Sequence, residues 1–196
     1  MYSVKYKTYP TPLFNEKEAM RYAGCPVADD ASAKLLSECY KEAEKILSYK
    51  VSWIKLPLEI NGSNCSFELF DLSSEKLAAN LAPCKKAVIF AATVGIELDR
   101  LISKYSKLSP AKALMFQAIG AERIEALCDT FCEDISSQLN CKTRPRFSPG
   151  YGDLALDNQK KIFSVLDCER KLGLSLNNSL LMSPTKSVSA ILGLID

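Results

Sequence analysis

The chain has 196 residues, 47% of them apolar and 24% charged, which is the composition of one ordinary globular domain. Lysine and arginine total 25 and aspartate and glutamate total 23, so a net charge of +2 argues against nucleic acid as a partner. The absence of histidine excludes Ser/His/Asp and Cys/His nucleophile systems, histidine-ligated zinc and any imidazole ligand from this chain to a metal cofactor.

The N-terminal segment 1–22 lacks the apolar run of about 7 to 15 residues that a signal peptide contains. No stretch approaches the roughly 20 apolar residues that span a bilayer. We therefore expect a cytoplasmic protein that makes no membrane contact. Eight irregularly spaced cysteines in a reducing compartment are then expected to be free thiols rather than a disulfide framework.

The first half of the chain predicts one helix and three strands. Apolar residues at helical spacing predict a helix over 29–50, which opens with a pair of aspartates suited to an N-cap. The alternating segments 51–60 and 65–70 flank the turn sequence "NGSN" and predict a hairpin, with Pro57 placing its strand at an edge or a bulge. The nearly continuous apolar run 85–95 predicts a central strand that is buried on both faces.

Two helices are predicted next. The pattern of 96–105 is helical, and Ser109 with Pro110 provides an N-cap and a first-turn proline for the longest helix, which extends to residue 139. Gly120 interrupts that helix. We interpret this glycine as a point where another element approaches the helix backbone, rather than as a functional kink.

The last part of the chain predicts a helix over 157–173, ended by Gly173. Two short apolar runs follow in 174–194, and their separation at 183–185 is hairpin-like. Helices and strands are mixed without regular βαβ alternation. The sequence therefore predicts a single α+β domain over 1–196, with a largely antiparallel or mixed sheet packed by several helices, one of them long and central.

Cysteines on the long predicted helix have the spacing of two ligands of an iron–sulfur cluster. If Cys128 and Cys132 were the first two cysteines of a C-x-x-x-C-x-x-C pattern, the third would fall at position 135, which is an isoleucine and cannot bind the cluster. We therefore interpret the two cysteines as packing residues on one helix face. A three-thiolate site with Cys141 stays formally open, but it lacks a fourth ligand of the usual kind. We predict no metal site.

The same helix carries several carboxylates, which fit a solvated polar face as well as they fit paired acid–base groups. They are Glu122, Glu125, Asp129, Glu133 and Asp134. Neither G-x-G-x-x-G nor G-x-x-x-x-G-K-[ST] occurs, so the sequence does not support Rossmann-type dinucleotide binding or P-loop phosphate binding.

The segment 143–153, "TRPRFSPGYGD", concentrates conformationally special residues. Its two prolines fix φ and remove backbone donors, and its two glycines permit tight turns or close approach by a ligand. Arg146 can present a planar fork to a carboxylate, and Tyr151 adds a flat apolar face with a polar tip. A well-ordered turn with a surface arginine and a core tyrosine is the alternative that these residues leave open.

Read as R-x-x-x-G-Y, residues 146–151 resemble the S-adenosylmethionine-binding signature of the activation domain of cobalamin-dependent methionine synthase. A second segment of that family is similar to "LDCERKLGLSLNNSLLMSPTKSVS" here, and the similarity covers roughly residues 143–190. The positions in register are Met182, Pro184, Ser187, Val188 and Ser189.

The resemblance implies a protein that binds S-adenosylmethionine and supports reductive methylation of cob(II)alamin. The cobalamin would be carried by a partner, a cobalamin-binding methionine synthase or another corrinoid protein, with flavodoxin or ferredoxin as electron donor. Arg146 would pair with the methionine carboxylate, and Ser148, Pro149 and Gly150 would line the adenosyl moiety, largely through main-chain atoms. Tyr151 would lie between ligand and corrin, in a catalytic position; the alternative is that its hydroxyl completes a hydrogen bond in the core.

Because the chain runs from Met1 to Asp196, we expect a free-standing activation subunit of methionine synthase; whether it turns over substrate itself is left open. The aromatic-rich stretch that follows the Ser-Val-Ser segment in the family is replaced here by "AILGLID". Two alternatives follow: a corrinoid-protein interaction module that no longer binds S-adenosylmethionine, or an activator of a different corrinoid methyltransferase.

Overall fold

The computed structural model describes residues 2–27 and 29–195. Its centre is a five-stranded sheet in which every neighbouring pair of strands is antiparallel. In order across the sheet the strands are β1 (Lys5–Tyr9), β2 (Tyr49–Pro57), β6 (Lys86–Thr93), β10 (Ser187–Ile195) and β7 (Lys142–Thr143). Two small antiparallel sheets are formed by β3 (Glu59–Asn61), β4 (Asn64–Ser66) and β5 (Asp71–Ser73), and by β8 (Ser175–Leu176) and β9 (Met182–Ser183).

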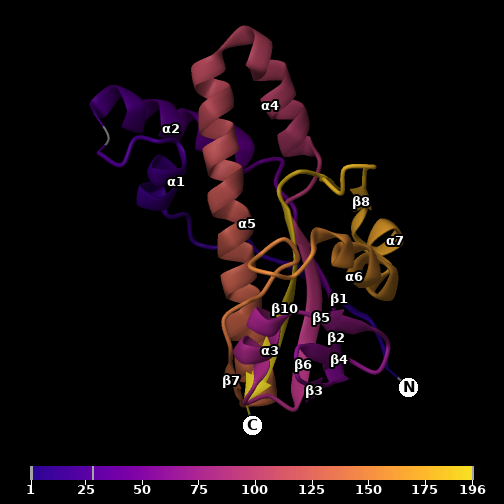
Figure 1. Ribbon diagram of the computed structural model, residues 1–196. Helices are drawn as coiled ribbons and strands as arrows, with labels where there is room; N and C mark the ends of the chain where they lie inside the picture. The colour runs from indigo at the N-terminus through magenta and orange to yellow at the C-terminus, as the bar shows by residue number, and fades with distance from the viewer. Residues whose placement is uncertain (1, 28, 196) are drawn as a thin grey trace.

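Helices cover both faces of this sheet (Figure 1). The first core contains side chains of α1 (Glu16–Tyr22), α2 (Asp30–Ala43), α4 (Glu97–Leu108) and α5 (Pro110–Leu139). The second core, on the other face, contains side chains of α3 (Glu75–Leu81), α6 (Gln159–Leu166) and α7 (Cys168–Leu172), with the 3₁₀ turn η1 (Leu156–Asn158) directly before α6. The α+β class, the antiparallel sheet and the long central helix are confirmed.

Strand β6 joins the two cores. Val88 and Phe90 belong to the first core, whereas Ile89 and Ala91 belong to the second. Because successive side chains of a strand point to opposite faces, an apolar residue at every position requires burial on both faces. Residues 87–93 are all buried, so the predicted central strand is confirmed.

The strands around β6 pair differently from the prediction. The expected hairpin of 51–60 with 65–70 forms only at its turn, where the short strands β3 and β4 pair across residues 62–63. Residues 51–57 of the first segment belong to β2, which pairs with β1 and β6 instead. Pro57 is the last residue of β2, beyond Trp53 where pairing with β1 ends, which fits the predicted edge position. The sequence patterns identified no strand at β1.

The C-terminal hairpin is also wrong in its partners. The predicted turn at 183–185 instead leads from β9 to β10, whereas β8 and β9 pair with each other across the loop 177–181. β10 pairs with β6 from Ser187 opposite Thr93 to Leu194 opposite Lys86. Alternation of apolar residues identifies a strand but not its partner, and here the partner lies about 100 residues earlier in the chain.

Two predicted helices are shorter than expected. α2 ends at Ala43, before β2 begins, and the expected helix over 157–173 is divided at Asp167, whose φ of 52° is left-handed. Asp29 caps α2 by accepting a hydrogen bond from the Ser32 backbone N–H at 2.7 Å, and Gly173 ends α7 with a φ of 68°, as predicted.

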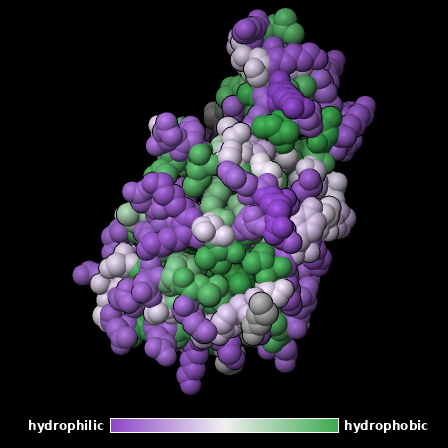
Figure 2. Space-filling view, turned by 90° about the vertical axis from the view of Figure 1, so that its right-hand side faces the viewer, coloured by the Kyte–Doolittle hydropathy of each residue, from purple (hydrophilic) through white to green (hydrophobic). Residues whose placement is uncertain are grey.

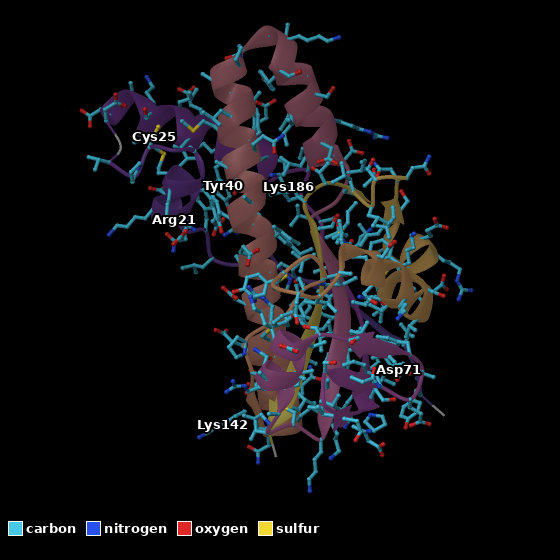
Figure 3. All side chains as sticks on the ribbon, viewed as in Figure 1. Arg21, Cys25, Tyr40, Asp71, Lys142 and Lys186 are labelled. Atoms are coloured by element: carbon cyan, nitrogen blue, oxygen red, sulfur yellow. The ribbon has the colours of Figure 1, made fainter. Side chains whose placement is uncertain are left out.

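Gly120 lies where other elements press against α5. A Cβ atom at this position would lie 2.6 Å from Leu98 Cδ2 and 2.8 Å from Lys186 Cγ, so α4 and the segment before β10 both approach the helix backbone. Lys186 is labelled beside α5 in Figure 3. The predicted close approach is confirmed.

Seen from the side of α6 and α7, the surface is largely hydrophilic, and the broadest apolar patch lies in its lower half (Figure 2). At the margin of the second core, Ile60, Phe70 and Val165 remain partly exposed. Over residues 2–27 and 29–195, none of the helices combines the length and hydropathy that crossing a membrane requires.

Candidate functional site

The segment 143–153 begins by extending the edge of the main sheet. The Arg144 N–H donates to the Gly193 carbonyl at 2.9 Å, and Phe147 and Ile191 exchange two backbone hydrogen bonds of 2.9 Å each. The Phe147 side chain is buried in the second core. Arg146 is thus held between two backbone attachments to β10.

A compact turn follows. The Tyr151 N–H donates to the Ser148 carbonyl at 3.1 Å, and the Gly150 N–H donates to the Leu154 carbonyl at 2.8 Å. Gly150 and Gly152 have φ angles of 88° and 61°, which side chains other than glycine rarely adopt. The predicted use of glycines for a tight turn is confirmed at both positions.

Tyr151 lies on the surface of this turn. Its side chain is 65% exposed and packs edge-to-face on Phe147, with ring centroids 5.2 Å apart. Tyr151 is therefore not a core tyrosine, and its ring is presented to solvent. Pro149 beside it is buried and Gly150 is exposed.

The guanidinium of Arg146 forms ion pairs with two carboxylates of α5. Nη1 lies 2.5 Å from Asp129 Oδ1, and Nη2 lies 2.8 Å from Glu125 Oε2. The two acidic residues are four apart on the helix and so share one face. The predicted arginine fork is present, but both of its arms are bound within the chain.

Arg146 lines one hollow of the surface, and its two carboxylate partners line another. One, of about 520 Å³, is lined by residues 143–146, by Asp129 and Cys132 of α5, and by Leu192 of β10. The other, of about 910 Å³, lies between the N-terminal segment 12–22 and α5. Asp129 lines both, so the ion pairs of Arg146 stand at the boundary of the two hollows.

A buried arginine holds the N-terminal wall of the larger hollow. Arg123 is fully buried, and its Nη1 and Nη2 donate to the carbonyls of Pro12 and Leu13, each at 2.6 Å. Its Nε lies 2.5 Å from Glu122 Oε2, and Glu122 Oε1 accepts from the Asn15 N–H at 3.1 Å. The sequence patterns did not identify this role, although a Glu-Arg pair within an otherwise apolar helix face was the available signal.

The carboxylates of α5 therefore serve several purposes. Glu122 is buried with its neighbouring arginine, Glu125 and Asp129 hold the signature arginine, and Asp134 accepts a hydrogen bond of 2.5 Å from the Tyr9 hydroxyl. Burial, and after it this hydrogen bond to Asp134, raise the pKa of Tyr9. The prediction of a simple solvated face is wrong for Glu122.

The cysteines of α5 pack within the first core, as predicted. Burial raises the pKa values of the Cys128 and Cys132 thiols, against the lowering effect of the nearby Arg146 charge. None of the eight cysteines, all of which lie in the described residues, forms a disulfide. Within the described part of the chain, no three His, Cys, Asp or Glu side chains are grouped to hold a metal ion.

Comparisons with known proteins agree with this architecture. The sequence model of the family "Vitamin B12 dependent methionine synthase, activation domain" matches residues 84–194. This range contains β6, α5, the segment 143–153 and all of β10 except its last residue. A search of curated proteins gives no match. A crystal structure of the MetH reactivation domain bound to AdoHcy shares the fold, with a TM-score of 0.73 and 15% identity over 98% of this chain and 78% of that one. Because the family model matches more than half of this chain, the chain belongs to the family of vitamin B12 dependent methionine synthase activation domains.

Proposed function

We propose that this protein binds S-adenosylmethionine beside Arg146 and supports the reductive methylation of cob(II)alamin held by a cobalamin-binding methionine synthase. The observation that carries the proposal is the position of the R-x-x-x-G-Y segment. Its arginine lines one hollow and is paired with carboxylates that line a second, and its tyrosine is exposed, in a chain of the activation-domain family. The structurally similar reactivation domain was crystallised with AdoHcy, which supports a ligand of this chemical class.

In this proposal the Arg146 fork binds the methionine carboxylate. The ligand must replace at least one of the ion pairs to Glu125 and Asp129, whose side chains are 46% and 65% exposed and can be hydrated after release. S-adenosylmethionine also carries positive charge on its sulfonium and ammonium groups, which the acidic wall of α5 complements. The main chain of Ser148 and Gly150, with Pro149, lines the adenosyl moiety.

The chain contributes binding and orientation, and the reagents contribute the reactivity. Cobalamin on the partner accepts the methyl group, and flavodoxin or ferredoxin supplies the electron. Because this chain has no histidine, a protein imidazole ligand to the cobalt would have to come from the partner. The exposed ring of Tyr151 is the group that we place between S-adenosylmethionine and the corrin.

We further propose that residues 1–196 act as one cytoplasmic domain. In support, β1 and β10 belong to one sheet, and both cores are built on the two faces of that sheet. An independent N-terminal unit would require a core of its own.

The test combines calorimetry with a reactivation assay. The purified protein is titrated with S-adenosylmethionine, then mixed with a cob(II)alamin-loaded synthase, S-adenosylmethionine and a reductant while cobalamin absorbance is followed. We expect a binding signal, and formation of methylcobalamin that requires both the protein and S-adenosylmethionine. Absence of both results would overturn the proposal.

The internal ion pairs of Arg146 favour a second candidate, a corrinoid-protein interaction module without S-adenosylmethionine binding. Formation of a complex with the synthase in the absence of any calorimetric signal would support this alternative. If the protein instead promotes methylation of another corrinoid protein and not of methionine synthase, it activates a different methyltransferase.

A further inference from the structure

The segment 143–153, called the signature segment from here on, is attached to helix α3 at the N-terminus of that helix. The Asp153 carboxylate accepts hydrogen bonds from the Ser74 hydroxyl, from the Glu75 N–H at 2.7 Å and from the Lys76 N–H at 3.3 Å. These groups, led by the Ser74 hydroxyl, lower the pKa of Asp153. An ionised carboxylate at this end of a helix also interacts favourably with the helix dipole.

The other end of α3 is attached to the start of the same segment. Arg144 Nε donates to the Asn80 carbonyl at 2.8 Å, one residue before the last residue of the helix. A cation at a helix C-terminus is favourable for the same electrostatic reason that an anion is favourable at the N-terminus. The segment 144–153 therefore binds α3 at both ends with the matching charge.

Close packing between these attachments adds to the contact. A Cβ atom at Gly152 would lie 2.7 Å from Cδ and 3.5 Å from Cβ of Lys76, so the turn packs directly against the first turn of α3. Gly152 directly precedes Asp153 and follows Tyr151. The exposed tyrosine is thus two residues from the attachment at the N-terminus of α3.

A capping function alone does not account for Asp153. Ser74 already caps α3, because its hydroxyl oxygen accepts a hydrogen bond from the Leu77 N–H at 2.9 Å. The Asp153 carboxylate makes additional bonds to a helix end that has its own cap. Their structural consequence is to fix the turn 148–153 on α3.

We propose that helix α3 is a rigid support, or splint, that fixes the conformation of the signature segment. In this proposal Asp153 is a positioning residue, which holds Tyr151 and the turn 148–153 in their binding geometry. The inference rests on the proposed function in one respect, namely that the turn fixed by α3 binds S-adenosylmethionine. Helix α3 lies outside residues 84–194, so the splint adds to what the family match covers.

The test compares Asp153→Ala with Asp29→Ala. Asp29 is a matched control because it is an exposed aspartate that caps a helix, α2, by a hydrogen bond to Ser32. In Asp153→Ala we expect faster amide hydrogen exchange at Gly150 and Leu154. The S-adenosylmethionine dissociation constant should rise about tenfold, the scale on which loss of a helix-terminal carboxylate shifts a conformational equilibrium.

The control should lose thermal stability and keep wild-type affinity. Asp153→Asn keeps one acceptor oxygen and should give an intermediate affinity, and it replaces the alanine variant if that variant fails to fold. Unchanged affinity in folded Asp153 variants would overturn the inference. If the wild type itself does not bind S-adenosylmethionine, the proposed function fails, and the exchange rates at Gly150 and Leu154 then decide whether α3 fixes the turn.

Discussion

Substitution of Arg146 by alanine tests the site most directly. The change removes two ion pairs, to Asp129 at 2.5 Å and to Glu125 at 2.8 Å. Both carboxylates are more than a third exposed and become hydrated after the substitution, so solvent screening reduces the loss. We expect the free energy of unfolding to fall by only about 1 kcal/mol.

The expected effect on ligand binding follows from the same geometry. A charged hydrogen bond to a ligand carboxylate contributes about 1.5 to 3 kcal/mol. The ligand must first displace a carboxylate of α5 from Arg146, and an exposed ion pair contributes up to about 1 kcal/mol. When the displaced ion pair contributes the full 1 kcal/mol, the net loss in Arg146→Ala is about 0.5 to 2 kcal/mol, which raises the S-adenosylmethionine dissociation constant about 2- to 30-fold.

Isothermal titration calorimetry and urea unfolding measure the two effects separately. Arg146→Lys keeps the charge without the planar fork and should bind with intermediate affinity. Arg170→Ala is the control, because Arg170 is 79% exposed and pairs with Asp167 at the N-terminal end of its own helix, α7. Wild-type affinity in a folded Arg146→Ala variant would refute the assignment of the ligand carboxylate to this arginine.

Three further predictions concern stability. Arg123→Ala should lower the free energy of unfolding by about 3 to 5 kcal/mol in urea titrations, because it leaves Glu122 and two carbonyls buried without their partner; a loss below 1 kcal/mol would contradict this. Gly120→Ala should reduce the melting temperature despite the better helix propensity of alanine, because overpacking costs about 1 to 3 kcal/mol. A higher melting temperature would contradict this and would mean that α4 shifts to accommodate the added methyl group. Because the pKa of Asp153 is lowered in the folded protein, its ionised carboxylate stabilises the fold at pH values above its unfolded-state pKa, and this stabilisation is lost as the pH falls through its folded-state pKa. Urea unfolding as a function of pH should therefore show that acid destabilises Asp153→Asn less than the wild type.

The sequence identified those features that depend on neighbouring residues. Apolar runs and caps predicted β6, α5 and the turn at 148–153, because burial on two faces, a proline in the first helical turn and glycines at positive φ are local requirements. The two-part motif also pointed to the family that the comparison over residues 84–194 shows. Helix ends were less well defined, as at Asp167, where an aspartate rather than a glycine adopts the left-handed conformation.

Tertiary structure alone decided which strands pair and which charges meet. β10 and β6 are separated by about 100 residues, and their register depends on the two cores that they share rather than on either strand by itself. Arg146 could be recognised as a fork for a carboxylate, but only the packing of α5 beside the sheet edge brings Glu125 and Asp129 to it. An arginine fork binds any carboxylate that the fold places within reach, so the sequence determined its chemistry and the tertiary structure determined its partners.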